Sequence, residues 1–266
     1  MTYWVAFGAL TLFVLGLLLV STRASQRIVS ELTAEQAHEP VEAVDGVDGA
    51  GVDTRPDNGS PTPSPHDTAP RTPSTTALLA NVGVSHGLFA ALLLVGIWLA
   101  NVPVWTLGVG VNVTGLDAVA IGIAVGVAIA VVNTLLGGLI SADPSARLRE
   151  LLTPESVPGW VLLLCVVLPI IAGFEELLFR AILIGAFSVG FELSPWLLVV
   201  GSSIAFAAGH GAQGRLGIAV TGALGLTLGV VFVLTGSLLV VIVAHYVVNA
   251  IEFVLVEGIG YEPFSS

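Results

Sequence analysis

Long apolar runs separated by short polar segments dominate the chain. The first run, residues 3–20, contains no charged residue, and six more follow at 77–100, 116–140, 159–187, 195–210, 216–234 and 238–256. Continuous apolar runs of about 18 or more residues are typical of transmembrane helices, whereas strands of a membrane β-barrel alternate every second residue. We therefore predict an all-α, polytopic transmembrane helix bundle with about seven spans. The run that ends at His210 is short, and we expect it to stop within the membrane or to line a cavity.

Composition supports the membrane class. Hydrophobic residues make up 55% of the chain and charged residues only 10%, with a mean hydropathy of +0.96. A soluble domain carries about a quarter of charged residues. The lipid bilayer is therefore a predicted partner, and the lack of a basic cluster argues against binding to nucleic acid.

The segment after the first run differs from the rest of the chain. Residues 21–76 are rich in Pro, Asp, Glu, Ser, Thr and Gly, and nine of the 19 acidic residues lie between Glu31 and Asp67. Such a segment buries too little apolar surface to fold, so we predict a disordered acidic linker. The chain then divides into an N-terminal transmembrane anchor (1–20), this linker (21–76), a membrane domain (77–257) and a C-terminal tail (258–266).

All eight basic residues are arginines, and their positions predict the orientation of the spans. If the spans cross alternately, seven of the arginines fall on one side: Arg23, Arg27, Arg55, Arg71, Arg147, Arg149 and Arg215. The positive-inside rule makes that side cytoplasmic. We expect a multi-pass protein of the cell membrane with a cytoplasmic linker. Two pairs of glycines four residues apart, Gly122 with Gly126 and Gly225 with Gly229, predict close helix packing.

The eighth arginine, Arg180, lies inside an apolar run together with Glu175 and Glu176. An ionisable group near the membrane centre costs about 2.5–3.5 kcal/mol on insertion scales, so three of them within six residues require a reason. Glu176 and Arg180 are four residues apart and can pair on one helical face, while Glu175 points about 100° away and stays available. The alternative is that Pro169 breaks the span and the pair lies at the membrane surface.

Further polar residues occur on two later runs. His210 ends one run, and His245 and Asn249 occupy positions i and i+4 on the last. A single histidine of this kind is more often a packing residue than a functional one. Polar groups on three separate helices instead favour a shared cluster in the interior of the bundle, where each finds a partner. We interpret Glu252 as a residue of the helix end and assign no role to His86.

Two kinds of chemistry suit these side chains. Glu175 can take a proton from a water that attacks an amide carbonyl, while Asn249 and one histidine donate hydrogen bonds to the oxyanion. Alternatively, His210, His245 and Glu175 are the ligand types of a catalytic divalent metal such as zinc, although the signature H-E-x-x-H is absent. The sequence leaves both readings open.

Three motifs carry a family resemblance: Glu175-Glu176-x-x-x-Arg180, Phe206-x-x-x-His210 and His245-x-x-x-Asn249, in this order on successive membrane runs. They resemble the CPBP family, which comprises type II CAAX prenyl endopeptidases and bacteriocin-processing or immunity proteins and is also called the Abi family.

The resemblance implies that residues 77–257 form an intramembrane protease domain. It implies Glu175 as the water-activating base, His210 and His245 as catalytic or metal-binding partners, Asn249 as the oxyanion donor, and Glu176 and Arg180 as their support. Members are often labelled metalloproteases. The implied substrate is a peptide or membrane-protein tail, with prenylated substrates among the candidates. The alternatives are a non-catalytic immunity or scaffold protein and an ion-coupled transporter, for which we find no inverted repeats.

Overall fold

The computed structural model describes residues 1–38, 74–110, 112–140 and 146–261, and every regular element in these ranges is helical. In the described residues, six helices are long and apolar enough to cross a membrane, judged by length and composition: Trp4–Arg23, Thr75–Leu99, Gly115–Leu136, Val157–Gly190, Gly214–Thr235 and Leu238–Gly258. A shorter apolar helix, Pro195–Gly209, is the run that was expected to be short. Its 15 residues extend about 22 Å at 1.5 Å per residue, less than the roughly 30 Å of a bilayer core. The chain is a multi-pass membrane protein.

The first helix, α1 (Trp4–His38), is longer than the predicted anchor. It continues beyond Val20 because residues 21–38 contain neither Gly nor Pro and include many good helix formers such as Ala, Glu, Gln and Arg. The first proline of the chain is Pro40. The remainder of the predicted linker, residues 39–73, and the end of the predicted tail lie outside the described residues.

The helix that carries the two glutamates is continuous from Val157 to Gly190. It consists of α5 (Val157–Leu162), a π-helical turn η3 (Leu163–Val167), α6 (Leu168–Glu176), a second π-helical segment η4 (Leu177–Ala186) and α7 (Phe187–Gly190). Pro169 stands at the start of α6, directly after the first π-helical turn, so the wider turn accommodates the proline and the helix goes on. The alternative that Pro169 ends the span is therefore wrong.

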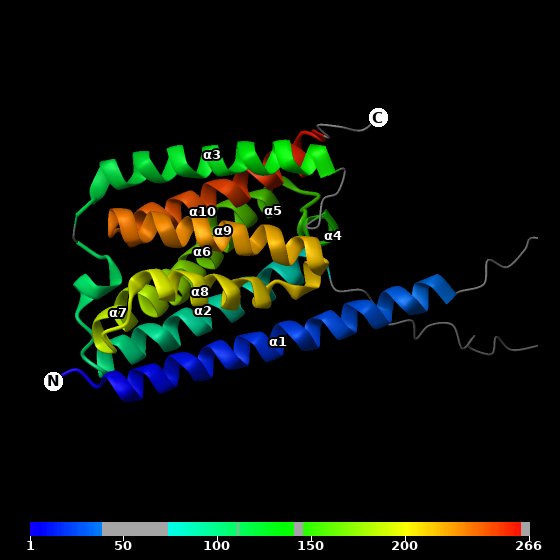
Figure 1. The fold of residues 1–266 in the computed structure, drawn as a ribbon. Coiled ribbons are helices and arrows are strands. Elements are labelled where there is room, and N and C mark those ends of the chain that lie inside the picture. Colours follow the sequence, from blue (N-terminus) through cyan, green and yellow to red (C-terminus); the bar gives the residue numbers. More distant parts are fainter. Residues whose placement is uncertain (39–73, 111, 141–145, 262–266) are drawn as a thin grey trace, which may run out of the picture.

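The remaining helices pack around this long helix (Figure 1). After α2 (Thr75–Leu99) and the short 3-10 turn η2 (Val104–Leu107), α3 (Gly115–Ile140) lies on the opposite side of the bundle from α1. The helices α8 (Pro195–Gly209) and α9 (Gly214–Thr235) are joined by the 3-10 turn η5 (Gly211–Gln213). The last helix, α10 (Leu238–Glu252), continues into a π-helical end η6 (Phe253–Gly258) and packs against α3, α6 and α9.

The glycine pairs lie where helices approach closely, as predicted. A β-carbon added at Gly122 would lie 2.8 Å from the Val240 carbonyl oxygen, and one at Gly126 would lie 2.6 Å from that of Ala244. These glycines bring α3 against the backbone of α10. On α9, Gly225 and Gly229 face α8 in the same way, because a β-carbon at either would lie 3.1 Å from a side chain of that helix.

The short helix α4 (Ala146–Leu152) and the turn between α8 and α9 lie at one end of the bundle, toward which α1 also runs (Figure 1). This end carries Arg149, which is buried and pairs with Glu257 at 3.5 Å between Nε and Oε1. The grouping agrees with the arginine pattern, and the side of the membrane that this end faces stays a prediction.

Candidate active site

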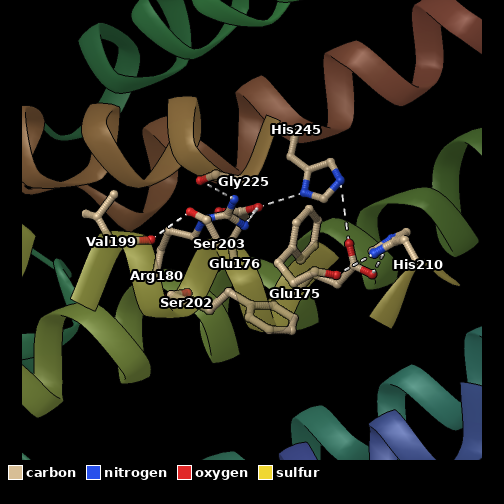
Figure 2. A network of polar contacts seen from close by, with 11 residues as sticks. Glu175, Glu176, Arg180, Val199, Ser202, Ser203, His210, Gly225 and His245 are labelled. Atoms are coloured by element: carbon tan, nitrogen blue, oxygen red, sulfur yellow. Dashed lines mark hydrogen bonds and ion pairs between the residues drawn. The ribbon is translucent and has the colours of Figure 1, made fainter. Parts of the chain in front are cut away.

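Five of the six predicted site residues come together in the interior of the bundle (Figure 2). Glu175 and Glu176 end α6, and Arg180 follows one turn later in η4. His210 stands at the C-terminal end of α8, and His245 lies midway along α10. Segments far apart in sequence thus contribute one polar cluster, as the cost of separate charges in a membrane predicts.

Glu176 is the centre of a fully buried network. Its Oε1 accepts a hydrogen bond of 2.7 Å from Nη1 of Arg180 and another of 2.7 Å from Nδ1 of His245. The second terminal nitrogen of Arg180 donates to the Gly225 carbonyl oxygen at 3.1 Å. Glu176 is 0% exposed and Arg180 1%. The predicted i, i+4 pair therefore forms, and it links the glutamate helix to α9 and α10.

An aromatic ring fills the space between the charged groups. The Arg180 guanidinium carbon lies 4.8 Å from the ring centre of Phe206, a cation–π contact. The same ring lies 4.7 Å from the His210 ring and 6.0 Å from the His245 ring, between centroids. Phe206 thus touches both histidines and the arginine.

Glu175 faces the two histidines rather than the arginine (Figure 2). Its carboxylate oxygens lie 3.5 Å from Nε2 of His245 and 3.8 Å from Nε2 of His210. Both separations exceed those of good hydrogen bonds and are suited to groups that share a third molecule. His210 has a side chain 26% exposed, so this side of the cluster is the accessible one.

The other ring nitrogen of each histidine fixes its tautomer. Nδ1 of His245 bonds to the Glu176 carboxylate, and Nδ1 of His210 lies 2.9 Å from the Phe206 carbonyl oxygen. Both partners only accept hydrogen bonds, so Nδ1 carries the proton and Nε2 of the neutral ring holds a free lone pair. When both rings are neutral, their two Nε2 lone pairs therefore face the Glu175 carboxylate.

The sixth residue, Asn249, is not joined to this network by a hydrogen bond with another described residue. It lies one turn beyond His245 on α10 and is half-buried. No group of three or more His, Cys, Asp or Glu side chains in the described part of the chain is arranged to hold a metal ion, and the metal role of Glu175, His210 and His245 stays a prediction.

Several contacts of the site were not predicted from the sequence. The Gly225 carbonyl and the Phe206 ring contact Arg180 directly, and the Ser202 hydroxyl donates to the Phe179 carbonyl at 2.6 Å. Phe206 entered the prediction only as the first residue of a motif. Backbone carbonyls have no residue type of their own, so only the three-dimensional packing reveals the other two contacts.

A family comparison covers this region. Residues 155–251 match the family model described as Type II CAAX prenyl endopeptidase Rce1-like. Residues 155–251 thus form an Rce1-like segment. The match contains the five clustered residues and Asn249, and it confirms the family resemblance that rested on the three motifs. Comparisons with curated proteins and with solved structures gave no match. At family level, this match supports a CAAX-protease-like intramembrane endopeptidase.

Proposed function

We propose that this chain hydrolyses a peptide bond of a membrane-associated peptide or protein tail, with Glu175 as the base that activates the attacking water. The observation that carries the proposal is the position of the Glu175 carboxylate, which faces both histidine Nε2 atoms at 3.5 and 3.8 Å. A water beside them, bonded to both groups, would give one hydrogen to the carboxylate and the other to an Nε2 lone pair. Its oxygen lone pair would then point at the substrate carbonyl.

The reaction proceeds in two steps. The water oxygen attacks the carbonyl carbon while Glu175 takes a proton, which gives a tetrahedral intermediate with a negative oxygen. The proton then passes from Glu175 to the amide nitrogen, the C–N bond breaks, and an acid and an amine are released. We assign stabilisation of the oxyanion to the Asn249 carboxamide, whose side chain is not engaged with another described residue.

Glu176 and Arg180 have a supporting role in this proposal. The Glu176 carboxylate holds the Nδ1 proton of His245 and so keeps Nε2 of that ring as an acceptor toward the water. Arg180 balances the charge of Glu176 inside the bundle. Participation of a divalent metal held by Glu175, His210 and His245 stays a separate hypothesis.

The test is cleavage of a fluorogenic peptide library, with prenylated peptides included, by protein in lipid nanodiscs. Glu175→Gln keeps the shape of the side chain but removes the base, so we expect kcat to fall by about 10² to 10⁴. Glu155→Gln makes the same change at an exposed glutamate outside the cluster and should retain the wild-type rate. Each protein is assayed with and without a chelator, and loss of wild-type activity on chelation would support the metal hypothesis.

Two results would count against the proposal. Wild-type turnover by Glu175→Gln would remove the assigned base. Absence of cleavage by the wild-type protein across the library, with the protein folded, would favour the non-catalytic immunity or scaffold alternative.

A further inference from the structure

The short stretch from Glu176 to Arg180 is held by three different helices. Glu176 bonds to His245 on α10, and Arg180 bonds to the Gly225 carbonyl on α9. The third attachment comes from α8, where the Ser202 hydroxyl donates to the Phe179 carbonyl oxygen at 2.6 Å. The first two attachments involve residues of the family motifs, whereas the third involves a serine to which no role has been assigned.

Ser202 behaves differently from its neighbour Ser203. The Ser203 hydroxyl donates to the Val199 carbonyl at 2.7 Å, four residues back in its own helix, which is the usual bond of a serine inside a helix. Ser202 instead donates across the helix interface to a residue 23 positions away, and it is only 5% exposed. Both serines are drawn beside the Glu176–Arg180 pair in Figure 2.

The carbonyl that Ser202 holds belongs to the peptide unit that joins Phe179 to Arg180. This unit lies in the π-helical segment η4, where backbone hydrogen bonds span five residues instead of four. A carbonyl oxygen has two lone pairs and can accept from the serine in addition to a bond within its own helix. The serine therefore ties the backbone of Arg180 to α8 in addition to the bonds within its own helix.

From this geometry we infer that Ser202 is a positioning residue of the endopeptidase site, an inference that rests on the function proposed above. Its hydroxyl sets the backbone from which Arg180 reaches Glu176, and Glu176 in turn holds Nδ1 of His245. Ser202 touches neither Glu175 nor a histidine in any of these bonds. It acts through Arg180 and Glu176 on the orientation of the His245 ring.

Removal of the hydroxyl should affect catalysis without affecting substrate binding. In Ser202→Ala the Phe179 carbonyl can still accept a hydrogen bond from an N–H of its own helix, so we expect the fold to be retained. We expect Arg180 and His245 to lose part of their fixed orientation. Small misplacements of catalytic groups cost up to about 100-fold in rate. For a hydroxyl that acts through two other residues, we expect a fall in kcat of about tenfold, with KM changed by less than about twofold.

The experiment compares Ser202→Ala, Ser202→Thr and Ser203→Ala with wild type and Glu175→Gln in nanodiscs. Ser203→Ala removes a hydroxyl of the same size from the neighbouring buried position and should keep the wild-type kcat. Ser202→Thr retains the donor and should recover most of the activity. An unchanged kcat in Ser202→Ala, an equal loss in Ser203→Ala, or a change confined to KM would overturn the inference.

A second readout does not depend on turnover. Protein labelled with ¹⁵N-histidine should show a strongly hydrogen-bonded Nδ1–H signal of His245, assigned by its loss in His245→Gln. We expect this signal to broaden or move in Ser202→Ala and to stay unchanged in Ser203→Ala. An unchanged signal in Ser202→Ala would overturn the inference even if no substrate is cleaved. If Ser202→Ala fails to fold, Ser202→Cys replaces it, since a thiol is only a weak donor, and wild-type signal and kcat in that variant would equally overturn it.

The two proposals fail in different ways. Loss of activity in Glu175→Gln together with wild-type behaviour of Ser202→Ala overturns the role of Ser202 alone. Wild-type turnover in Glu175→Gln overturns the proposed function, whatever Ser202→Ala does to the His245 signal.

Discussion

Replacement of Arg180 by methionine should destabilise the protein more than any other single change in the cluster. Methionine fills a similar volume but leaves the Glu176 carboxylate, which is 0% exposed, without its cation. Removal of one partner of a buried ion pair costs about 3–5 kcal/mol, because the other charge stays buried. The Gly225 carbonyl also loses the hydrogen bond of 3.1 Å that Arg180 donates to it, which lies within the normal range for such bonds. The Phe206 ring loses its cation–π contact with the guanidinium.

A double variant separates the charge effect from the effect of packing. In Arg180→Met with Glu176→Gln both members of the buried ion pair are replaced by neutral groups, and an amide in place of the carboxylate can still accept the Nδ1 proton of His245. We expect the double variant to recover more than half of the stability lost in Arg180→Met. Its activity should stay low, since the guanidinium no longer fixes the group that orients His245.

Thermal unfolding in one detergent measures both variants against wild type. At about 2–4 °C for each kcal/mol in a chain of this size, Arg180→Met should lower the transition by about 6–20 °C, and the double variant should reverse most of that shift. The reasoning is refuted if Arg180→Met unfolds within about 2 °C of wild type, or if the double variant is less stable than the single one.

Three further predictions follow from individual contacts. Gly126→Ala should destabilise the protein by about 1–3 kcal/mol, because its new methyl group would meet the α10 backbone. Gly201→Ala is the control, since a β-carbon there meets nothing within 4 Å, and it should leave the unfolding temperature unchanged in the same thermal unfolding measurement. Phe206→Leu should cost about 0.5–2 kcal/mol through the lost cation–π contact and should lower kcat, since the ring also contacts both histidines. Glu257→Gln, which removes the charge that pairs with buried Arg149 at the end of the bundle, should lower stability while kcat keeps its wild-type value.

Much of the fold could be predicted because a membrane imposes a simple rule on sequence. Each span must be apolar over a length set by the bilayer, so the runs at residues 77–100 or 216–234 identify helices without any knowledge of their packing. The end of α1 was missed, because beyond Val20 the helix depends on backbone propensity rather than on hydropathy. The π-helical segments were missed too, because an apolar run does not distinguish a π-helical turn from an α-helical one.

In the site, contacts within one helix could be predicted from the sequence, whereas contacts between helices could not. The Glu176–Arg180 pair follows from helical spacing alone and forms as predicted. The bond between Glu176 and His245 joins residues 69 positions apart, so it depends on how α6 meets α10, which spacing within one helix does not determine. Asn249 shares a face with His245 by spacing, yet it forms no hydrogen bond with the cluster in the described residues, because a shared face does not fix the direction of a side chain.

Sequence analysis detects a residue of this site by the free energy of placing its side chain in a membrane, not by its importance to the site. Glu175 and Arg180 stand out because each charge is expensive in an apolar run and needs a partner. Ser202 is inconspicuous, because a serine in a membrane helix can bond to its own backbone at little cost, as Ser203 does. The sequence does not distinguish the two adjacent serines. They differ in the structure, because only the Ser202 hydroxyl bonds to the Phe179 carbonyl, at 2.6 Å. Supporting residues of this kind should therefore be sought among small polar residues at helix interfaces, where geometry alone separates a packing serine from a positioning one.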